Sequence, residues 1–317
     1  MKRVCIILAG LTVLAGLTYA TVVGAPLVYR NTHATLTFTG DSMLDRYIRK
    51  TAAAREDGFS GIAIGFDDLF SRSDLVVSNL EGPVTSAASV SEHTTAGDAN
   101  NMRFTFPPAS LAFLSANSIN LVSIGNNHIT DFGPDGVRQT KQHLTDAGIA
   151  FVGDPYSTSA TATTTINGVS LAFVSYNQFL GPSAEETVTA IERAGETADH
   201  TVVLAHWGEE YRTGPTPLQQ RLAHRFIDAG ATLVVGTHPH VVQNREHYNG
   251  GVIFYSLGNF VFDQYWHPAV RCGLVATVSL DTTALTDIAT TTAWMRTDGT
   301  TVHTVCDPTI TSPVLTP

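Results

Sequence analysis

The sequence lacks any run of lysine or arginine. Its 18 lysine and arginine residues are outnumbered by 28 aspartates and glutamates, which gives a formal net charge of −10 over 317 residues. Proteins that bind nucleic acid neutralise phosphate groups with clustered basic side chains. The composition therefore argues against nucleic acid as a partner, and also against a polybasic patch that would bind a membrane surface.

Cysteine is also scarce, with three residues in the chain. Cys5 lies too near the start of an apolar N-terminal segment to become a lipid-modified cysteine after cleavage. Cys272 and Cys306 are candidates for a disulfide in an oxidising exterior, and two buried free thiols are the alternative. The sequence does not separate these two states.

Charged side chains are absent from Val4 to Tyr29, directly after the basic start Lys2-Arg3. A cleavable signal peptide has an apolar stretch of roughly 7–15 residues, whereas a membrane-spanning helix needs about 20. The short segments that end at Ala20 and Ala25 contain small residues and could be cleaved as signal-peptide sites. We expect residues 1–30 to form a single-pass membrane anchor or a signal peptide, with the rest of the chain outside the cytoplasm, or secreted if the segment is cleaved.

The remaining residues alternate short apolar strands with stretches of helical periodicity. Predicted strands are 34–39, 75–78, 121–124, 169–176, 201–205, 233–236 and 252–257, and predicted helices are 44–54, 137–147 and 217–229. This alternation predicts an α/β sandwich with mixed sheets. Threonine-rich strands follow at 274–280, 288–295 and 302–305 and predict an antiparallel layer. We therefore expect one domain over 31–275, with a β-rich extension of it at 276–317.

Polar residues of the kind that bind metals follow most of the predicted strands. In open α/β sheets, ligands bind beyond the carboxyl ends of the strands. The residues at these positions are Asp41, Glu81, Asn127, His128, His206, His238 and His240. Carboxylate, amide and imidazole groups of this kind hold the two ions of hydrolytic metal sites, which lie ~3.5–4 Å apart. Taken alone, Asp41 could instead cap the helix that follows it.

Six sequence segments occur in the order seen in a known protein family. They are GDSM (40–43), NLEGP (79–83), NNHITDFG (126–133), HWGEEY (206–211), GTHPH (236–240) and YSLGNFVFDQ (255–264). Together they resemble the bacterial CapA family of poly-γ-glutamate capsule synthesis proteins, over about residues 34–275. The resemblance implies a metallophosphatase-like α/β sandwich, remotely similar to the calcineurin-type phosphoesterases.

That resemblance also implies roles for individual residues. Asp41 matches the first aspartate of the phosphoesterases, Glu81 takes the place of their bridging aspartate, and Asn127 with His128 resembles their Asn-His pair. His206, His238 and His240 resemble their later histidine ligands. The resemblance therefore implies that Asp41, Glu81, Asn127 and these three histidines bind one or two divalent ions (Mn, Fe, Zn or Ca), with Asp41 and His128 as the catalytic residues.

Two positions depart from the phosphoesterase pattern. Met43 stands where those enzymes carry a histidine, and Glu81 is longer than the aspartate that it replaces. Both changes predict that one of the two metal sites is weak or absent. The sequence therefore leaves open whether the protein is an enzyme.

Three further residues are weaker candidates for binding substrate: Asn79, Arg46 and Asn259. Asn79 shares a strand face with Glu81, because side-chain direction repeats every two residues. Arg46 could contact a carboxylate-rich polymer, as could Arg103 and Arg212, and a solvated surface position is the alternative for each. Residues 255–262 are expected to be mostly structural, with Asn259 alone near the site. Trp207 could line a groove or pack in the core.

Four functions remain open at this point. The first is a membrane-anchored, extracytoplasmic component of capsule synthesis, with poly-γ-glutamate or a similar polymer and membrane-embedded capsule synthase components as partners. The second is an exported metal-dependent hydrolase of a phosphoester or amide. The third is a non-catalytic tethering protein of the same fold. The fourth is metal-independent proton transfer by Asp41, His128 and a later histidine.

Overall fold

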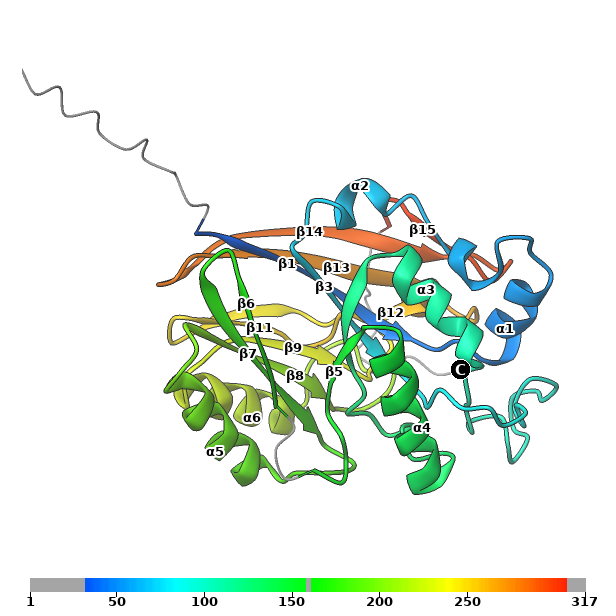
Figure 1. Ribbon diagram of the computed structural model, residues 1–317, viewed down its shortest axis with the longest axis horizontal. Helices are drawn as coiled ribbons and strands as arrows, with labels where there is room; N and C mark the ends of the chain where they lie inside the picture. Colours follow the sequence, from blue (N-terminus) through cyan, green and yellow to red (C-terminus); the bar gives the residue numbers. More distant parts are fainter. Residues whose placement is uncertain (1–31, 158–160, 307–317) are drawn as a thin grey trace, which may run out of the picture. The chain divides into compact units, whose positions relative to one another are not determined.

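The computed structural model describes residues 32–157 and 161–306. The predicted anchor or signal segment, residues 1–30, lies outside the described residues. Among the helices of the described part, none is long and apolar enough to cross a membrane. The described residues form a mixed α/β fold built on two sheets (Figure 1).

The first sheet has nine strands and contains both parallel and antiparallel pairs. In spatial order its strands are β2 (Ala63–Ile64), β15 (Thr301–His303), β14 (Leu285–Met295), β13 (Cys272–Leu280), β1 (Ala34–Ser42), β3 (Leu75–Leu80), β4 (Ile119–Ser123) and β5 (Ala150–Val152), with β12 (Asn259–Val261) paired to β1 off this path. Strands β1, β3, β4 and β5 run parallel, whereas β13 and β14 are antiparallel to their neighbours. The threonine-rich C-terminal strands thus continue the sheet that carries Asp41.

The second sheet has six strands, with parallel strands in its centre and an antiparallel strand at each edge. Its order is β10 (Arg245–Tyr248), β11 (Gly251–Phe254), β9 (Ala231–Thr237), β8 (His200–His206), β7 (Val169–Asn177) and β6 (Thr161–Ile166). Strands β6 and β7 form a hairpin, whose turn residues Asn167 and Gly168 have φ angles of 51° and 87°. Positive φ at both central residues is what a two-residue hairpin turn requires.

Apolar side chains fill the space between the two sheets and cover their outer faces. Leu36 and Phe38 of β1 belong to the same buried cluster as Phe173 of β7 and Leu204 of β8. On the outer face of the second sheet lie α5 (Ala184–Gly195) and α6 (Pro217–Asp228), within a separate cluster. The molecule therefore has helices outside two packed sheets, which confirms the predicted α/β sandwich with mixed sheets.

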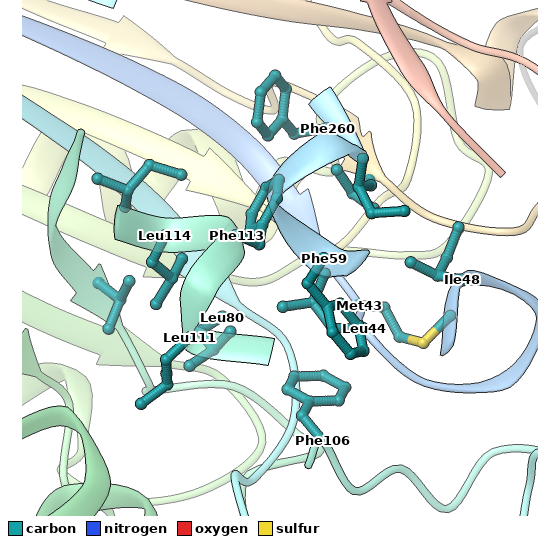
Figure 2. Packing of buried hydrophobic residues seen from close by; sticks show 14 of the residues in the cluster. Met43, Leu44, Ile48, Phe59, Leu80, Phe106, Leu111, Phe113, Leu114 and Phe260 are labelled. Atoms are coloured by element: carbon teal, nitrogen blue, oxygen red, sulfur yellow. The ribbon is translucent and has the colours of Figure 1, made fainter. Parts of the chain in front are cut away.

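A third cluster packs helices against the first sheet (Figure 2). The helices on this side are α1 (Arg46–Ala53), α2 (Asp67–Phe70), α3 (Leu111–Ala116), α4 (Gly133–Asp146) and the short 3₁₀ turns η1 (Gly58–Gly61) and η2 (Pro108–Ser110); α7 (Pro268–Arg271) leads into β13. Met43 is fully buried among Leu44, Phe59 and Phe106 in this cluster. The side chain at the position of the phosphoesterase histidine is therefore a packed core residue.

Several predicted boundaries differ from the structure, including the following three. Helix α4 begins at Gly133, a turn before the expected Val137, with Pro134 in its first turn, where proline is tolerated because no N–H partner is needed. Strand β1 extends through Asp41 to Ser42, because the Asp41 amide donates to the Gly258 carbonyl of the segment leading into β12. The predicted strand 252–257 ends at Phe254, and residues 259–261 pair with the other sheet.

Cys272 and Cys306 form a disulfide, with a Cα–Cα separation of 6.0 Å. The bond joins the first residue of β13 to the segment after β15, across a separation of 34 residues. The structure thereby decides between the two states that the sequence left open. A crosslink of this kind stabilises a fold chiefly by restricting the unfolded chain.

Candidate metal centre

Ligand-type side chains from both sheets meet at one end of the sandwich. Asp41 lies at the end of β1 and Glu81 directly follows β3, whereas His206 ends β8 and both His238 and His240 follow β9. All five side chains are buried, and Asp41 and Glu81 are fully inaccessible to solvent. The carboxyl ends of the parallel strands thus bring these predicted ligands together, as expected for this class of sheet.

Six side chains form two groups that could each hold a metal ion. Asp41, Glu81 and His206 form one group, and Glu210, His238 and His240 form the other; within each group the potential ligand atoms lie within 4.8 Å of one another. His240 links the groups, with Nδ1 at 3.4 Å from Asp41 Oδ2 and Nε2 at 3.7 Å from Glu81 Oε1. The two groups are therefore neighbours in a single centre.

The turn that presents the two later histidines is strained. His238 has φ 95° and His240 has φ 58°, in a region that residues other than glycine rarely adopt. The His238 amide donates to Asp41 Oδ2 at 3.1 Å, which ties this turn to β1. Strain of this kind is typical of functional sites, because the surrounding structure must hold the residues in place.

Asn79 lies between the two buried carboxylates and holds them in position. Its Nδ2 donates to Asp41 Oδ1 at 2.7 Å and lies 3.4 Å from Glu81 Oε2. Its Oδ1 accepts a hydrogen bond from Asn126 Nδ2 at 3.2 Å. Asn79 is buried, so the structure places this predicted substrate contact inside the centre, where it positions Asp41 and Glu81.

Asn127 and His206 contact each other directly. Asn127 Oδ1 lies 2.9 Å from His206 Nε2, and His206 Nδ1 lies 3.0 Å from Thr237 Oγ1. The imidazole thus bridges the chain after β4 and the end of β9. Both predicted ligands lie at the centre, with the amide oxygen of Asn127 directed at the Nε2 atom of His206.

His128 lies beside the two donor groups and belongs to neither. Its Nδ1 is 2.9 Å from Asp131 Oδ2, and its ring centroid is 4.3 Å from that of Phe104. A carboxylate at Nδ1 fixes the orientation of the ring and its tautomer. The arrangement suits a proton donor more than a metal ligand.

Burial and mutual charge shift the pKa values of the two carboxyl groups in opposite directions. Burial alone would raise the pKa of Asp41, but the hydrogen bond from His240 and the charges of His240 and His206 hold it well below its usual value. Burial raises the pKa of Glu81 well above its usual value, and the Asp41 carboxylate adds to this effect. The metal-free centre therefore favours an ionised Asp41 beside a protonated Glu81.

The pKa values of the three histidines also shift in opposite directions. Burial and the neighbouring His238 lower the pKa of His206 well below its usual value, and burial and the charge of His240 lower the pKa of His238 to about 3. Burial would also lower the pKa of His240, but its hydrogen bond with Asp41 and the charge of Asp41 raise it. His206 and His238 are therefore neutral at physiological pH, which is the form that binds metal.

Two buried atoms of this centre have no hydrogen-bond partner in the described part of the chain: Glu81 Oε1 and His238 Nδ1. Leaving such a group unsatisfied costs about 1–3 kcal/mol. Each atom belongs to a different one of the two donor groups. Their presence among carboxylates and neutral imidazoles fits a divalent cation, which would supply the missing partner.

Arg46 and Asn259 lie at the edge of the centre. Arg46 is buried, forms a salt bridge with Asp263 and stacks over Phe104 at 5.0 Å, so the solvated-surface alternative is wrong for this residue. Asn259 Oδ1 lies 2.8 Å from His240 Nδ1, which supports its predicted place near the site.

The remaining sequence candidates lie outside the centre. Trp207 is fully buried and donates to the Tyr255 carbonyl, so it packs in the core and lines no groove. Arg103 donates to the Asp131 carbonyl, and Arg212 pairs with Glu209.

Sequence reasoning missed two residues that shape the centre. Glu210 completes the second donor group, although its neighbour Glu209 has the same chemistry and pairs with Arg212. Phe179 covers His238, with ring centroids 4.4 Å apart, while remaining 41% exposed. The motif around residue 210 was visible in the sequence, but nothing local distinguishes Glu210 from Glu209, and no pattern marks Phe179.

Comparisons with known proteins identify a family and relatives of this chain. Residues 35–264 match the family described as "Bacterial capsule synthesis protein PGA_cap". The PGA biosynthesis protein CapA of Bacillus subtilis (strain 168) is 33% identical over 72% of this chain and 63% of that protein. The capsule biosynthesis protein CapA of Bacillus anthracis is 30% identical over 79% of this chain and 65% of that protein.

A similar solved structure is TT1561 of Thermus thermophilus, with a TM-score of 0.43 and 10% identity over 82% of this chain and 98% of that one. The chain spans less than two thirds of the length of either Bacillus relative. The family match itself extends from β1 to the residues after β12, and so includes every residue of the centre. The chain therefore belongs to the family of bacterial capsule synthesis proteins PGA_cap.

Proposed function

We propose that this protein acts in the synthesis of poly-γ-glutamate or a similar capsule polymer, through a metallophosphatase-like site that holds one or two divalent ions. One observation carries the proposal: two adjoining donor groups bury Glu81 Oε1 and His238 Nδ1 without hydrogen-bond partners among the described residues. Family membership and the names of the Bacillus relatives support the link to capsule synthesis.

Location and partners form part of the same proposal. The uncharged stretch Val4–Tyr29 supports a protein held at the cell membrane by its N-terminus, with its domain outside the cytoplasm, or secreted after cleavage. Membrane-embedded capsule synthase components are the proposed partners, because polymer synthesis at that surface would bring them together with an anchored domain.

The donor set indicates which ions fit. Asp41, Glu81 and His206 would hold one ion, and Glu210, His238 and His240 the other. A mixture of carboxylate and imidazole ligands suits Mn, Fe or Zn better than Ca, which prefers oxygen ligands alone. A bound dication supplies Lewis-acid polarisation of a phosphoryl or carbonyl oxygen.

His128 can deliver a proton to a leaving group. Asp131 accepts from its Nδ1, which fixes the ring and leaves Nε2 as the nitrogen that transfers a proton. Asn79 holds Asp41 in a single orientation, and Phe179 keeps solvent from one side of His238. These residues would bind, orient and protonate a phosphoester or amide substrate.

A non-catalytic tethering role is the alternative that a specific observation favours. Met43 replaces a phosphoesterase histidine and is packed in the core, so it contributes no ligand. Such a protein could keep the metal centre for structural reasons alone. A measurement of catalytic turnover distinguishes this tethering role from hydrolysis.

The test uses the full-length chain purified in detergent. We expect the wild type to bind one or two Mn²⁺ ions and to hydrolyse bis-(p-nitrophenyl) phosphate or a γ-glutamyl anilide. Asp41→Asn and His128→Ala should abolish turnover, and only Asp41→Asn should lower metal content. A folded wild type that stays metal-free after supplementation would refute the metal site, and a metal-loaded protein without turnover would favour the tethering role.

A further inference from the structure

A cavity of about 550 Å³ lies next to the metal centre and has no role in the functions considered so far. Its walls come from α1, from the segment around residues 92–102, and from the segment that follows β12. Its lining includes Tyr47, Lys50, Asn101, Tyr211, Gln264 and Trp266. A concave site with aromatic walls and a few fixed polar groups is the usual form of a small-ligand site.

Aromatic side chains form the apolar part of the cavity. Tyr47 is 43% exposed and Trp266 is 37% exposed, although both are large rings that a folded chain normally buries. Trp266 is held edge-to-face against Tyr211, with ring centroids 5.0 Å apart. Two of the rings are therefore fixed in orientation while leaving area for a ligand.

Polar groups at the base of the cavity are fixed before any ligand binds. Arg46 forms a salt bridge with Asp263 and donates to Asn101 Oδ1 at 3.1 Å. The Tyr47 amide donates to Asp263 Oδ2 at 3.2 Å. Preorganised donors and acceptors of this kind reduce the entropy lost on binding.

The charges of the cavity do not suit a polyanion. Asp263 neutralises Arg46, which leaves Lys50 as the cation of the lining without a salt bridge in the described residues. Glu92 and Asp98 also line the cavity; Glu92 pairs with Arg49 at 3.9 Å, and hydrogen bonds from Thr95 lower the pKa of Asp98. The lining therefore has no excess of positive charge to attract a polymer with one negative charge on each residue.

A chain of hydrogen bonds connects the cavity with the metal centre. His240 Nδ1 lies 2.8 Å from Asn259 Oδ1, Asn259 Nδ2 donates to Gln264 Oε1 at 3.1 Å, and Gln264 Nε2 donates to the Tyr211 hydroxyl at 3.0 Å. Gln264 and Tyr211 both line the cavity. A ligand in contact with these two residues would therefore lie beside the second donor group.

We propose that this cavity binds a neutral glycosyl unit. A pyranose ring offers an apolar C–H face, which stacks on exposed aromatic rings such as Trp266 and Tyr47, and hydroxyl groups, which hydrogen-bond planar amides such as Asn101 and Gln264. The binding itself is independent of metal.

The first experiment is isothermal titration of the full-length, chelator-treated protein with neutral oligosaccharides of glucose and of N-acetylglucosamine, and with poly-γ-glutamate. We expect saturable binding of at least one neutral oligosaccharide and none of the polyanion. Trp266→Ala should weaken that binding at least about tenfold. Trp266→Phe should restore part of it, and circular dichroism of both variants checks that each is folded.

Two control variants sharpen the result. Lys50→Met removes the unpaired cation and should leave binding of the neutral sugar unchanged. Leu218→Ala removes an apolar side chain of similar exposure, 40%, on α6 and should also have no effect.

Two results would overturn the proposal. One is saturable binding of poly-γ-glutamate that Lys50→Met abolishes, and the other is the absence of binding by either oligosaccharide. Metal content is measured separately, so failure of the proposed metal centre would leave this test interpretable.

Discussion

Two regions of this protein bring histidine together with carboxylates, and they differ in burial and in whether the side-chain atoms have hydrogen-bond partners. In the second region, His224 Nε2 lies 3.0 Å from Glu246 Oε1, and the Tyr255 hydroxyl donates to Glu246 Oε2 at 2.7 Å. His224 also stacks on Tyr248 at 3.7 Å. We call this region the Glu246 cluster.

In the metal centre, by contrast, Glu81 Oε1 and His238 Nδ1 are buried without hydrogen-bond partners among the described residues. Both oxygens of Glu246 are satisfied by neighbouring side chains. The two regions therefore contain the same residue types but differ in whether each polar side-chain atom has a hydrogen-bond partner. Full burial and unpartnered ligand-type atoms, more than the presence of histidine, therefore separate the metal centre from the Glu246 cluster.

The largest expected difference concerns metal binding. The double variant His238→Ala, His240→Ala should lose the stabilisation that Mn²⁺ gives to the wild type, about 4 kcal/mol at a thousand-fold excess over Kd. His224→Ala should keep that stabilisation in full, because its ring has no role in the centre. Denaturant unfolding with and without Mn²⁺, together with metal analysis, measures both. Equal loss in the two variants would remove the distinction between the regions.

The next prediction concerns Glu81 in the metal-free protein. Its folded-state pKa is raised above the unfolded value of 4.5, so the folded form loses stability as the pH rises above that value. Glu81→Gln removes this loss and should stabilise the metal-free protein by about 1–3 kcal/mol at mildly alkaline pH. The same variant should bind Mn²⁺ more weakly. A destabilised metal-free Glu81→Gln protein would show that the carboxyl group is satisfied after all.

His238 gives a prediction with the opposite dependence on pH. Its pKa falls from 6.5 in the unfolded chain to about 3 in the folded protein, so its contribution is fully present above pH 6.5 and is lost as the pH falls towards 3. His238→Gln should flatten this dependence by up to about 1.4 kcal/mol per pH unit. Unfolding free energies of the chelator-treated protein across this range test it. An unchanged slope would mean that His238 takes up its proton in the folded state.

The smallest effect is expected in the Glu246 cluster. The hydrogen bond from Tyr255 lowers the pKa of Glu246, so this carboxylate stabilises the fold above pH 4.5, and the contribution is lost as the pH falls through the lowered value. Glu246→Gln should cost about 1 kcal/mol at neutral pH. Its Mn²⁺ stoichiometry should equal that of the wild type, and any decrease would indicate that the two regions are coupled.

Much of the architecture was predictable from local patterns. The alternation of apolar runs with helical stretches gave the α/β sandwich, because periodicity reports which side of an element is buried. Asp41, Glu81, His206, His238 and His240 could be selected because each follows or ends an apolar run, and the carboxyl ends of parallel strands meet at one edge of their own sheet. The packing of the two sheets then brings the two edges together.

Other features required the folded structure. Helix α4 begins a turn earlier than predicted, since the Asp-Phe-Gly-Pro-Asp-Gly sequence is compatible with both a turn and a first helical turn. Arg46 is polar and close to a predicted turn, which predicts exposure, yet Asp263, far along the chain, pairs with it in a buried site. The Cys272–Cys306 bond likewise depends on two segments meeting across β14.

By itself, then, the sequence determined the layered α/β architecture and the set of side chains at the strand ends, because both depend on residue type and on spacing along the chain. Only the tertiary structure decided that Glu210 and not Glu209 joins His238 and His240, and that Glu81 and His238 each keep a buried atom without a partner. Those outcomes depend on which distant segments pack together, and local sequence patterns carry no record of that packing.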